Sequence, residues 1–188
     1  MGRDTLGMTM DGTQAEAEMR FVEAWGRMGS VWGISRTMAE VHALLYITGE
    51  PLCTDDVMDR LEISRGNASM SLRALVDWGI ITRVHKRGDR KEYFLAEKDV
   101  WAIFRAIVGE RRKREVDPLL VSLHEIRDEI GQSDGGGHAE MSDRLDAMIS
   151  FLGLIATLSE RFAGPTGEGL ELAATLLGTA GVDRTTGD

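Results

Sequence analysis

Cysteine is almost absent from this chain, since Cys53 is the only one among 188 residues. A single thiol excludes an internal disulfide and a zinc site built from several cysteines. The amino-terminal segment MGRDTLGMTMDGTQAEAE has no apolar run of the kind found in signal peptides. The longest strongly apolar stretch, MISFLGLIATL, is shorter than the roughly 20 residues of a membrane-spanning helix. We therefore expect a cytoplasmic protein that does not enter the membrane.

Motifs for catalysis and for metal binding are also missing. The sequence contains no P-loop, no glycine fingerprint after a strand and no nucleophile elbow. The histidines do not have the spacing of metal ligands; they are His42, His85, His124 and His138. We expect no catalytic residues, no metal site and no cofactor.

Charge is divided unevenly along the chain. The formal net charge is −9, which by itself disfavours binding to a polyanion. Between Arg60 and Lys91, however, eight basic and three acidic side chains give +5, which leaves −14 for the rest of the chain. An acidic protein with one basic segment is typical of DNA binding confined to that segment.

Apolar periodicity and capping residues predict a mainly helical protein. Ser35 is placed to cap a helix that runs to about Thr48, and Thr54 is placed to cap the short helix DDVMDRLE. Pro118 interrupts a later long helix, with Asp117 able to cap its second part. The predicted organisation is a disordered tail over 1–12, a core with flanking helices over 13–131, a Gly-rich linker over 132–138, a C-terminal helical region over 139–180 and a disordered tail over 181–188.

The helix SRGNASMSLRALVDWG is the most informative segment. Ser64 can cap it, and Leu72, Leu75 and Val76 lie on its apolar face. The first two turns are short and polar although Gly66 weakens a helix, so we expect a large partner to approach this face closely. Asn67 and Arg73 suit base edges or phosphates, and the serine hydroxyls suit phosphates. The expected DNA-binding residues of this helix are Ser64, Arg65, Gly66, Asn67, Ser69, Met70, Ser71 and Arg73.

The segment IITRVHKRGDRKEYFLA predicts a β-hairpin with a basic tip, because β-branched and aromatic residues flank a Gly-Asp turn. A helix, a tight turn, a polar helix and a hairpin make a winged helix-turn-helix, whose second helix enters the major groove of DNA. The predicted fold is therefore mainly α with a small β-hairpin and long flanking dimerisation helices. The expected DNA-binding residues of the hairpin are His85, Lys86, Arg87, Asp89, Arg90 and Lys91.

The segment EPLCTDDVMDRLEISRGNASMSLRALVDWGIITRVHKRGDRKEYFLAE closely resembles the GbsR-type branch of the MarR family of bacterial transcriptional regulators. The similarity extends over roughly residues 20–120. It implies a homodimer that binds double-stranded DNA at a pseudo-palindromic operator, with the wing tips in the minor grooves. It also implies a functional pair in the wing, in which Asp89 orients Arg90, and a small-molecule effector such as a choline-like quaternary ammonium ion.

Several alternatives remain open at the level of sequence. Aromatic rings bind quaternary ammonium ions, and the candidate ligand-binding residues are Trp25, Trp32, Tyr46 and Trp101. The alternative for each is a role in the core or in an interface. The basic run of residues 111–114 is flanked by glutamates, which favours a solvated face over DNA contact. A winged helix that binds a protein partner instead of DNA is the second hypothesis, and a ligand carrier or enzyme is the third.

Overall fold

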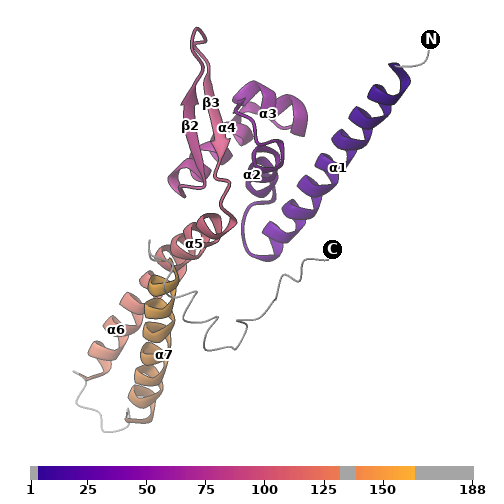
Figure 1. Ribbon diagram of the computed structural model, residues 1–188. Coiled ribbons are helices and arrows are strands. Elements are labelled where there is room, and N and C mark those ends of the chain that lie inside the picture. Colours follow the sequence, from indigo (N-terminus) through magenta and orange to yellow (C-terminus); the bar gives the residue numbers. More distant parts are fainter. Residues whose placement is uncertain (1–3, 132–138, 164–188) are drawn as a thin grey trace, which may run out of the picture. The chain divides into compact units, whose positions relative to one another are not determined.

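The computed structural model describes residues 4–131 and 139–163 (Figure 1). The chain divides into two compact units, with the boundary between Ile103 and Phe104. The predicted linker over 132–138 and the predicted tail over 181–188 lie outside the described residues.

The first unit contains the helix-turn-helix and the hairpin. Its elements are, in order, α1 (Asp4–Val31), α2 (Arg36–Thr48), β1 (Leu52–Cys53), α3 (Thr54–Leu61), α4 (Arg65–Asp77), β2 (Ile81–His85) and β3 (Glu92–Ala96), followed by the start of α5 (Val100–Arg111). The helix α1 begins at Asp4. The sequence predicted a disordered tail over 1–12 and a helix from about Thr13. These residues have no apolar periodicity, but extending an existing helix costs little once its packed part has formed.

The helix α2 is the centre of this unit and packs against α1, α3, α4 and β3 (Figure 1). Val41, Leu44 and Leu45 on α2 are fully buried, as are Leu72 and Leu75 on α4. Burial of each such side chain stabilises the fold by about 1.5–3 kcal/mol. The apolar face predicted for α4 is therefore the face that fixes this helix to the core.

A three-stranded antiparallel sheet has the order β1-β3-β2. In the hairpin, Ile81 pairs with Ala96 and His85 pairs with Glu92. The strand β1 was not predicted, because two residues are too few to show an alternating pattern. The cap of α3 also differs from the prediction: Cys53 precedes the helix, and its backbone N–H donates to the Asp56 carboxylate at 2.8 Å.

The turn between α3 and α4 is tight, as the sequence indicates. Glu62 has φ 53°, in the left-handed region, and the N–H of Ile63 donates to the carbonyl oxygen of Met58 at 3.3 Å. This turn brings α4 back against α2 and α3. The predicted class, mainly α with a small sheet in a winged helix, is confirmed.

The second unit consists of the rest of α5, a π-helical turn η1 (Arg112–Val116), α6 (Asp117–Gly131) and α7 (Ala139–Ala163). Pro118 was expected to interrupt the helix, but Asp117 has helical φ and ψ and the path continues through η1 into α6. Proline lacks an N–H and crowds the carbonyl four residues before it. The wider π turn directly before Pro118 accommodates that crowding.

The helices α6 and α7 pack against each other, and Arg127 on α6 pairs with Asp146 on α7 at 2.8 Å. The predicted C-terminal helical region is helical over Ala139–Ala163, and its remainder to residue 180 lies outside the described residues. No helix in the described part of the chain is both long enough and apolar enough to cross a membrane.

Candidate nucleic-acid interface

The amino-terminal half of α4 is held in place by its cap. The Oγ atom of Ser64 accepts a hydrogen bond from the backbone N–H of Asn67 at 3.3 Å, as predicted. Such a cap stabilises a helix start by about 1 kcal/mol. Arg65, Gly66 and Asn67 are exposed, and Met70 is 67% exposed. The first turns of α4 therefore present Gly66 and the side chains of Arg65, Asn67 and Met70 to solvent.

Ser71 does not belong to this exposed face. The structure buries it to 8% exposure, although we expected it to contact a phosphate. Ser71 lies three residues after Ala68 and four before Leu75, so helical geometry turns it toward the same side as these core residues. Ser69 is partly exposed and Arg73 is exposed, so both stay candidates.

Gly66 has open space around it. A Cβ atom added there would come no closer than 3.9 Å to its nearest neighbour, the Ser64 Oγ atom. The packing of the chain therefore does not require glycine at this position. A requirement for glycine would have to come from a molecule outside the chain.

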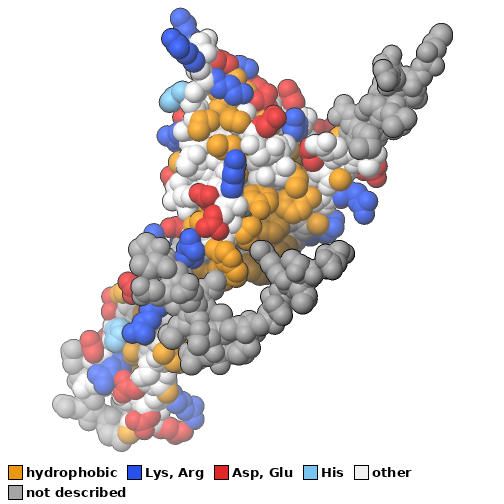
Figure 2. Space-filling view, viewed as in Figure 1, with side chains coloured by type: hydrophobic (Ala, Val, Ile, Leu, Met, Phe, Trp, Pro, Cys, Tyr) orange, Lys and Arg blue, Asp and Glu red, His pale blue; other side chains and the backbone are white. Residues whose placement is uncertain are grey.

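The strands β2 and β3 form the wing, which projects beyond the helices (Figure 1). Gly88 at its tip has φ +88°, a conformation that other residues rarely adopt. Basic side chains gather at this tip (Figure 2), and Arg87 and Arg90 are exposed. Lys86 places its Nζ atom 4.0 Å from the centre of the Tyr93 ring, a cation–π contact.

Asp89 orders the tip of the wing. Its carboxylate accepts a 2.6 Å hydrogen bond from the Tyr93 hydroxyl and a 2.9 Å hydrogen bond from the Lys91 backbone N–H. The hydrogen bond from Tyr93 contributes most to holding the pKa of Asp89 below its usual value, and the bond from Lys91 adds to it. The same carboxylate raises the pKa of Tyr93 to about 12. No ion pair joins Asp89 to Arg90 in the described part of the chain. Asp89 thus orders the loop that carries Arg90, and the backbone N–H of Arg90 also contributes to the lowered pKa of Asp89.

Asp55, near the start of α3, links α4 to the wing. One oxygen, Oδ1, lies 2.6 Å from Nη2 of Arg65, and the other, Oδ2, lies 3.2 Å from Nζ of Lys91. Lys91 and then Arg65 hold the pKa of Asp55 below its usual value, and Asp55 raises the pKa of Lys91. Neither Asp55 nor Tyr93 was predicted from the sequence to belong to this surface, because their contacts with Arg65, Lys91 and Asp89 form only in the folded chain.

The aromatic residues proposed for ligand binding are not gathered at one place. The ring centres of Trp25 and Tyr46 lie 6.2 and 6.1 Å from the ring centre of His42. His42 itself is buried, so this group is part of the packing between α1 and α2. Trp32 and Trp101 are exposed by 44% and 54%. The arrangement supports the core alternative for Trp25 and Tyr46.

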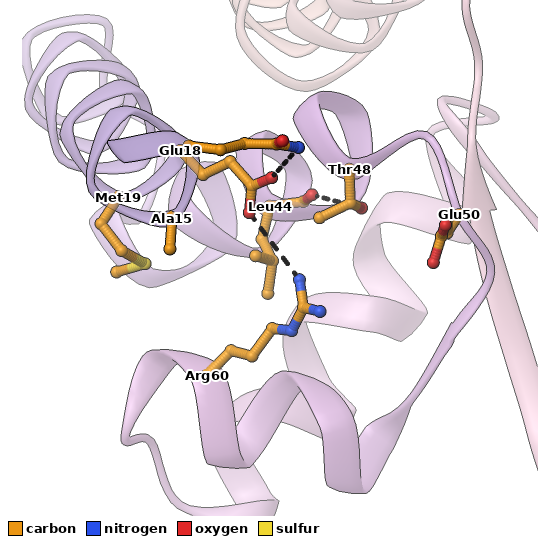
Figure 3. Close-up of a pocket in the computed structure, with 8 residues that line it drawn as sticks. Ala15, Glu18, Met19, Leu44, Thr48, Glu50 and Arg60 are labelled. Atoms are coloured by element: carbon orange, nitrogen blue, oxygen red, sulfur yellow. Dashed lines mark hydrogen bonds and ion pairs between the residues drawn. The ribbon is translucent and has the colours of Figure 1, made fainter. Parts of the chain in front are cut away.

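A cavity of about 520 Å³ lies between α1, α2 and α3 (Figure 3). Glu18 on α1 lies 4.0 Å from an Arg60 nitrogen on α3, across the cavity, and accepts a 3.3 Å hydrogen bond from Gln14, one turn earlier on α1. The other lining residues are Ala15, Met19, Leu44, Thr48 and Glu50. None of the four predicted aromatic residues lines this cavity in the described part of the chain.

The basic run of the second unit is paired internally. Arg111 lies 3.0 Å from Glu115, Lys113 lies 2.9 Å from Glu110, and Arg112 lies 3.7 Å from Asp117. These are the local pairs that a solvated helix face forms. The predicted solvated face accounts for this run without DNA.

The helices α2, α3 and α4 with the hairpin define a winged helix-turn-helix protein. Residues 32–92 match the MarR family model, and a solved transcriptional regulator shares the fold, with a TM-score of 0.62 and 22% identity over 81% of this chain and 99% of that one. The chain is also similar to three proteins of Bacillus subtilis (strain 168). It is 25% identical to the HTH-type transcriptional repressor GbsR over 100 residues, which are 53% of this chain and 55% of GbsR. The repressor OpcR is 21% identical over 122 residues, 63% of this chain and 66% of OpcR.

The putative HTH-type transcriptional regulator YvaV is 24% identical over 89 residues, which are 47% of this chain and 50% of YvaV. The matches span about half to two thirds of these curated relatives. Residues 32–92 thus match the MarR family, and the similarities support a DNA-binding regulator of the MarR/GbsR type. The family resemblance predicted from the sequence is confirmed.

Proposed function

We propose that the chain is a sequence-specific DNA-binding transcriptional regulator that acts as a homodimer, most simply as a repressor. The observation that carries this proposal is the surface of α4: its first turns are exposed, capped by Ser64 and free of bulky packing at Gly66. A helix of this kind can approach base edges in the major groove. The basic wing beside it supplies the charge that attracts phosphates.

The roles of individual residues follow from their chemistry and exposure. Asn67 and Arg73 have side chains that pair with base edges. Ser64, Ser69 and the exposed Arg87 suit phosphates. Arg90 at the tip of the wing suits a phosphate or the minor groove. Ser71 has no role in this interface because it is buried.

A homodimer is supported by exposed apolar side chains on and next to the helices that flank the winged helix. In the first unit, Trp32 and Trp101 are 44% and 54% exposed. In the second unit, Met148, Phe151 and Leu154 on α7 are 50–57% exposed. A second copy of the chain would bury such surfaces and would bring two copies of α4 to a two-fold symmetric operator.

Repression and an effector are proposed by analogy with the relatives. GbsR and OpcR are both named repressors. An effector that favours one spacing of the two α4 helices over another would change operator affinity by its difference in affinity for the two states. A choline-like quaternary ammonium ion is the candidate effector that the family resemblance provides.

Selection of binding sites from genomic DNA with the purified chain tests the proposal. We expect enrichment of a pseudo-palindromic sequence, and light scattering should show a dimer. In measurements on the selected site, Asn67→Ala should change sequence preference more than affinity for arbitrary DNA. Arg90→Ala should weaken binding to every sequence and reduce the salt dependence by about one counterion. Failure to enrich any DNA would favour the winged helix as a protein-binding module.

A further inference from the structure

A single carboxylate joins the start of the recognition helix to the base of the wing. Asp55 contacts Arg65, the first residue of α4, at 2.6 Å and Lys91, next to β3, at 3.2 Å. The backbone N–H of Lys91 in turn donates to Asp89, which accepts from Tyr93. One chain of contacts therefore runs from α3 through both parts of the proposed DNA surface.

The ion pairs of Asp55 contribute little to the stability of the fold. All three side chains are well exposed, by 42% for Asp55, 68% for Arg65 and 54% for Lys91. Ion pairs this exposed add little or nothing measurable to the free energy of unfolding. The start of α3 is already capped by Asp56, whose carboxylate accepts a hydrogen bond from the Cys53 N–H at 2.8 Å. Asp55 is thus available for a role at the surface.

The charges indicate what that role is. Arg65 and Lys91 are two cations, and pairing with the one carboxylate of Asp55 offsets half of their charge. Affinity for arbitrary DNA depends on how many phosphates the protein neutralises, and each one changes binding by up to about eightfold near 0.1 M salt. Recognition of a particular sequence depends instead on side chains held in register. A carboxylate shared by both cations lowers affinity for arbitrary DNA. It also helps to hold the cations in register for recognition of a particular sequence.

We propose that Asp55 is a specificity-determining residue of the DNA interface. It lowers affinity for arbitrary DNA by neutralising part of the charge of Arg65 and Lys91, and it holds both cations at a set spacing beside α4. Its loss raises binding to arbitrary DNA more than binding to the operator. This inference rests on the proposed function.

The test compares Asp55→Asn with Asp59→Asn in the full chain. Both changes remove one negative charge from α3, but Asp59 is exposed and forms no ion pair in the described residues. Fluorescence anisotropy measures binding to the selected operator duplex and to a scrambled duplex of equal length between about 50 and 200 mM salt. For Asp55→Asn we expect scrambled DNA to bind about three- to eightfold more tightly, with a salt slope steeper by about one. The ratio of operator to scrambled affinity should fall, and Asp59→Asn should change it much less.

Further variants separate this role from a structural one. In an Arg65→Ala/Lys91→Ala background, Asp55→Asn should no longer tighten binding to scrambled DNA. Asp55→Glu keeps the charge and should retain most of the wild-type salt slope. Equal effects of Asp55→Asn and Asp59→Asn on slope and ratio would overturn the inference while leaving the proposed function intact. A wild-type chain that binds neither duplex would overturn the proposed function itself.

Discussion

The Tyr93 hydroxyl donates a 2.6 Å hydrogen bond to the Asp89 carboxylate. Tyr93 is 9% exposed on β3, whereas Asp89 is exposed at the turn of the wing. The bond therefore anchors the exposed end of the hairpin to a residue fixed in the sheet. Two cations that we assign to DNA contact, Arg87 and Arg90, lie on either side of the anchored turn.

The pKa of Tyr93 reports on this bond. It is raised from 10.0 to about 12, mainly by the hydrogen bond to Asp89. In a Tyr46→Phe background Tyr93 is the one remaining tyrosine, so the ultraviolet absorbance of its phenolate can be titrated alone. We expect Asp89→Asn to lower the midpoint toward 10.0. The stability from this bond should be complete below about pH 10 and lost as pH rises toward about 12, because the folded state holds the proton more tightly.

Circular dichroism at each pH checks that the fold persists during this titration. Asp59→Asn serves as the matched change, since it removes an exposed carboxylate elsewhere in the same unit. If Asp89→Asn leaves the Tyr93 midpoint where it is in the Tyr46→Phe parent, the bond is absent in solution.

Substitutions at Gly66 test whether DNA must come close to the backbone of α4. A side chain at this position meets open space, with the nearest atom 3.9 Å from an added Cβ. Gly66→Leu should therefore leave the thermal midpoint unchanged or raise it, since glycine weakens a helix by about 1 kcal/mol relative to alanine. We expect operator affinity to fall at least about tenfold, as for the loss of a well-formed base contact. Binding by fluorescence anisotropy and melting by circular dichroism measure the two quantities.

Gly66→Ala is the graded control, because its single methyl group extends less far. It should retain more operator affinity than Gly66→Leu at similar stability. If Gly66→Leu binds operator as the wild type does, DNA does not approach α4 closely at this position.

The helix cap and the hairpin turn were predicted correctly because each depends on residues close together in the sequence. Ser64 caps α4 because its hydroxyl reaches an N–H three residues away, and Gly88 turns the hairpin because few other residues adopt its φ. The cap of α3 was placed one residue late, at Thr54, because a side-chain pattern favours threonine. The backbone of Cys53 and the carboxylate of Asp56 form the cap instead.

The parts that were missed depend on contacts that the chain makes only once it is folded. Asp55 reads as an acid at a helix start, and only the folded chain brings Arg65 and Lys91 to it. Tyr93 reads as an ordinary strand residue until the turn folds Asp89 over it. Ser71 was assigned to the wrong face because the helix side that packs on α2 and α3 is wider than its three largest apolar residues suggested.

Two glycines of α1 test how closely α1 and α2 pack. A Cβ added at Gly29 would lie 2.5 Å from the Ala39 Cβ, which is attached directly to the α2 backbone. A Cβ added at Gly26 would lie 2.6 Å from Cγ of Glu40, which a flexible side chain can move. We expect Gly29→Ala to lower the free energy of unfolding by about 1–3 kcal/mol, as overpacking does. Gly26→Ala should lower it less.

Urea unfolding of the two variants beside the wild type gives these free energies. Both substitutions gain the same helix propensity, so their difference isolates the contact with α2. Equal stabilities for Gly29→Ala and Gly26→Ala would mean that the two helices separate easily at Ala39.

We expect the buried His42 to make the fold less stable in mild acid. It is 3% exposed and its Nε2 atom has no hydrogen-bond partner among the described residues. Burial lowers its pKa from 6.5 to about 4. Because the unfolded chain takes up a proton that the folded chain excludes, stability should fall by about 3 kcal/mol as pH drops from 6.5 to about 4. His42→Leu removes the titrating group, so its free energy of unfolding should fall less over this range.

Urea denaturation at about pH 7 and near pH 4 measures this difference. Carboxylates also titrate in acid, so the quantity of interest is the change in the wild type minus the change in His42→Leu. His85→Gln is the control, because it replaces an exposed histidine on the wing. If the wild type and His42→Leu lose the same stability, His42 takes up its proton in the folded state, and the packing around His42 must open to let it do so.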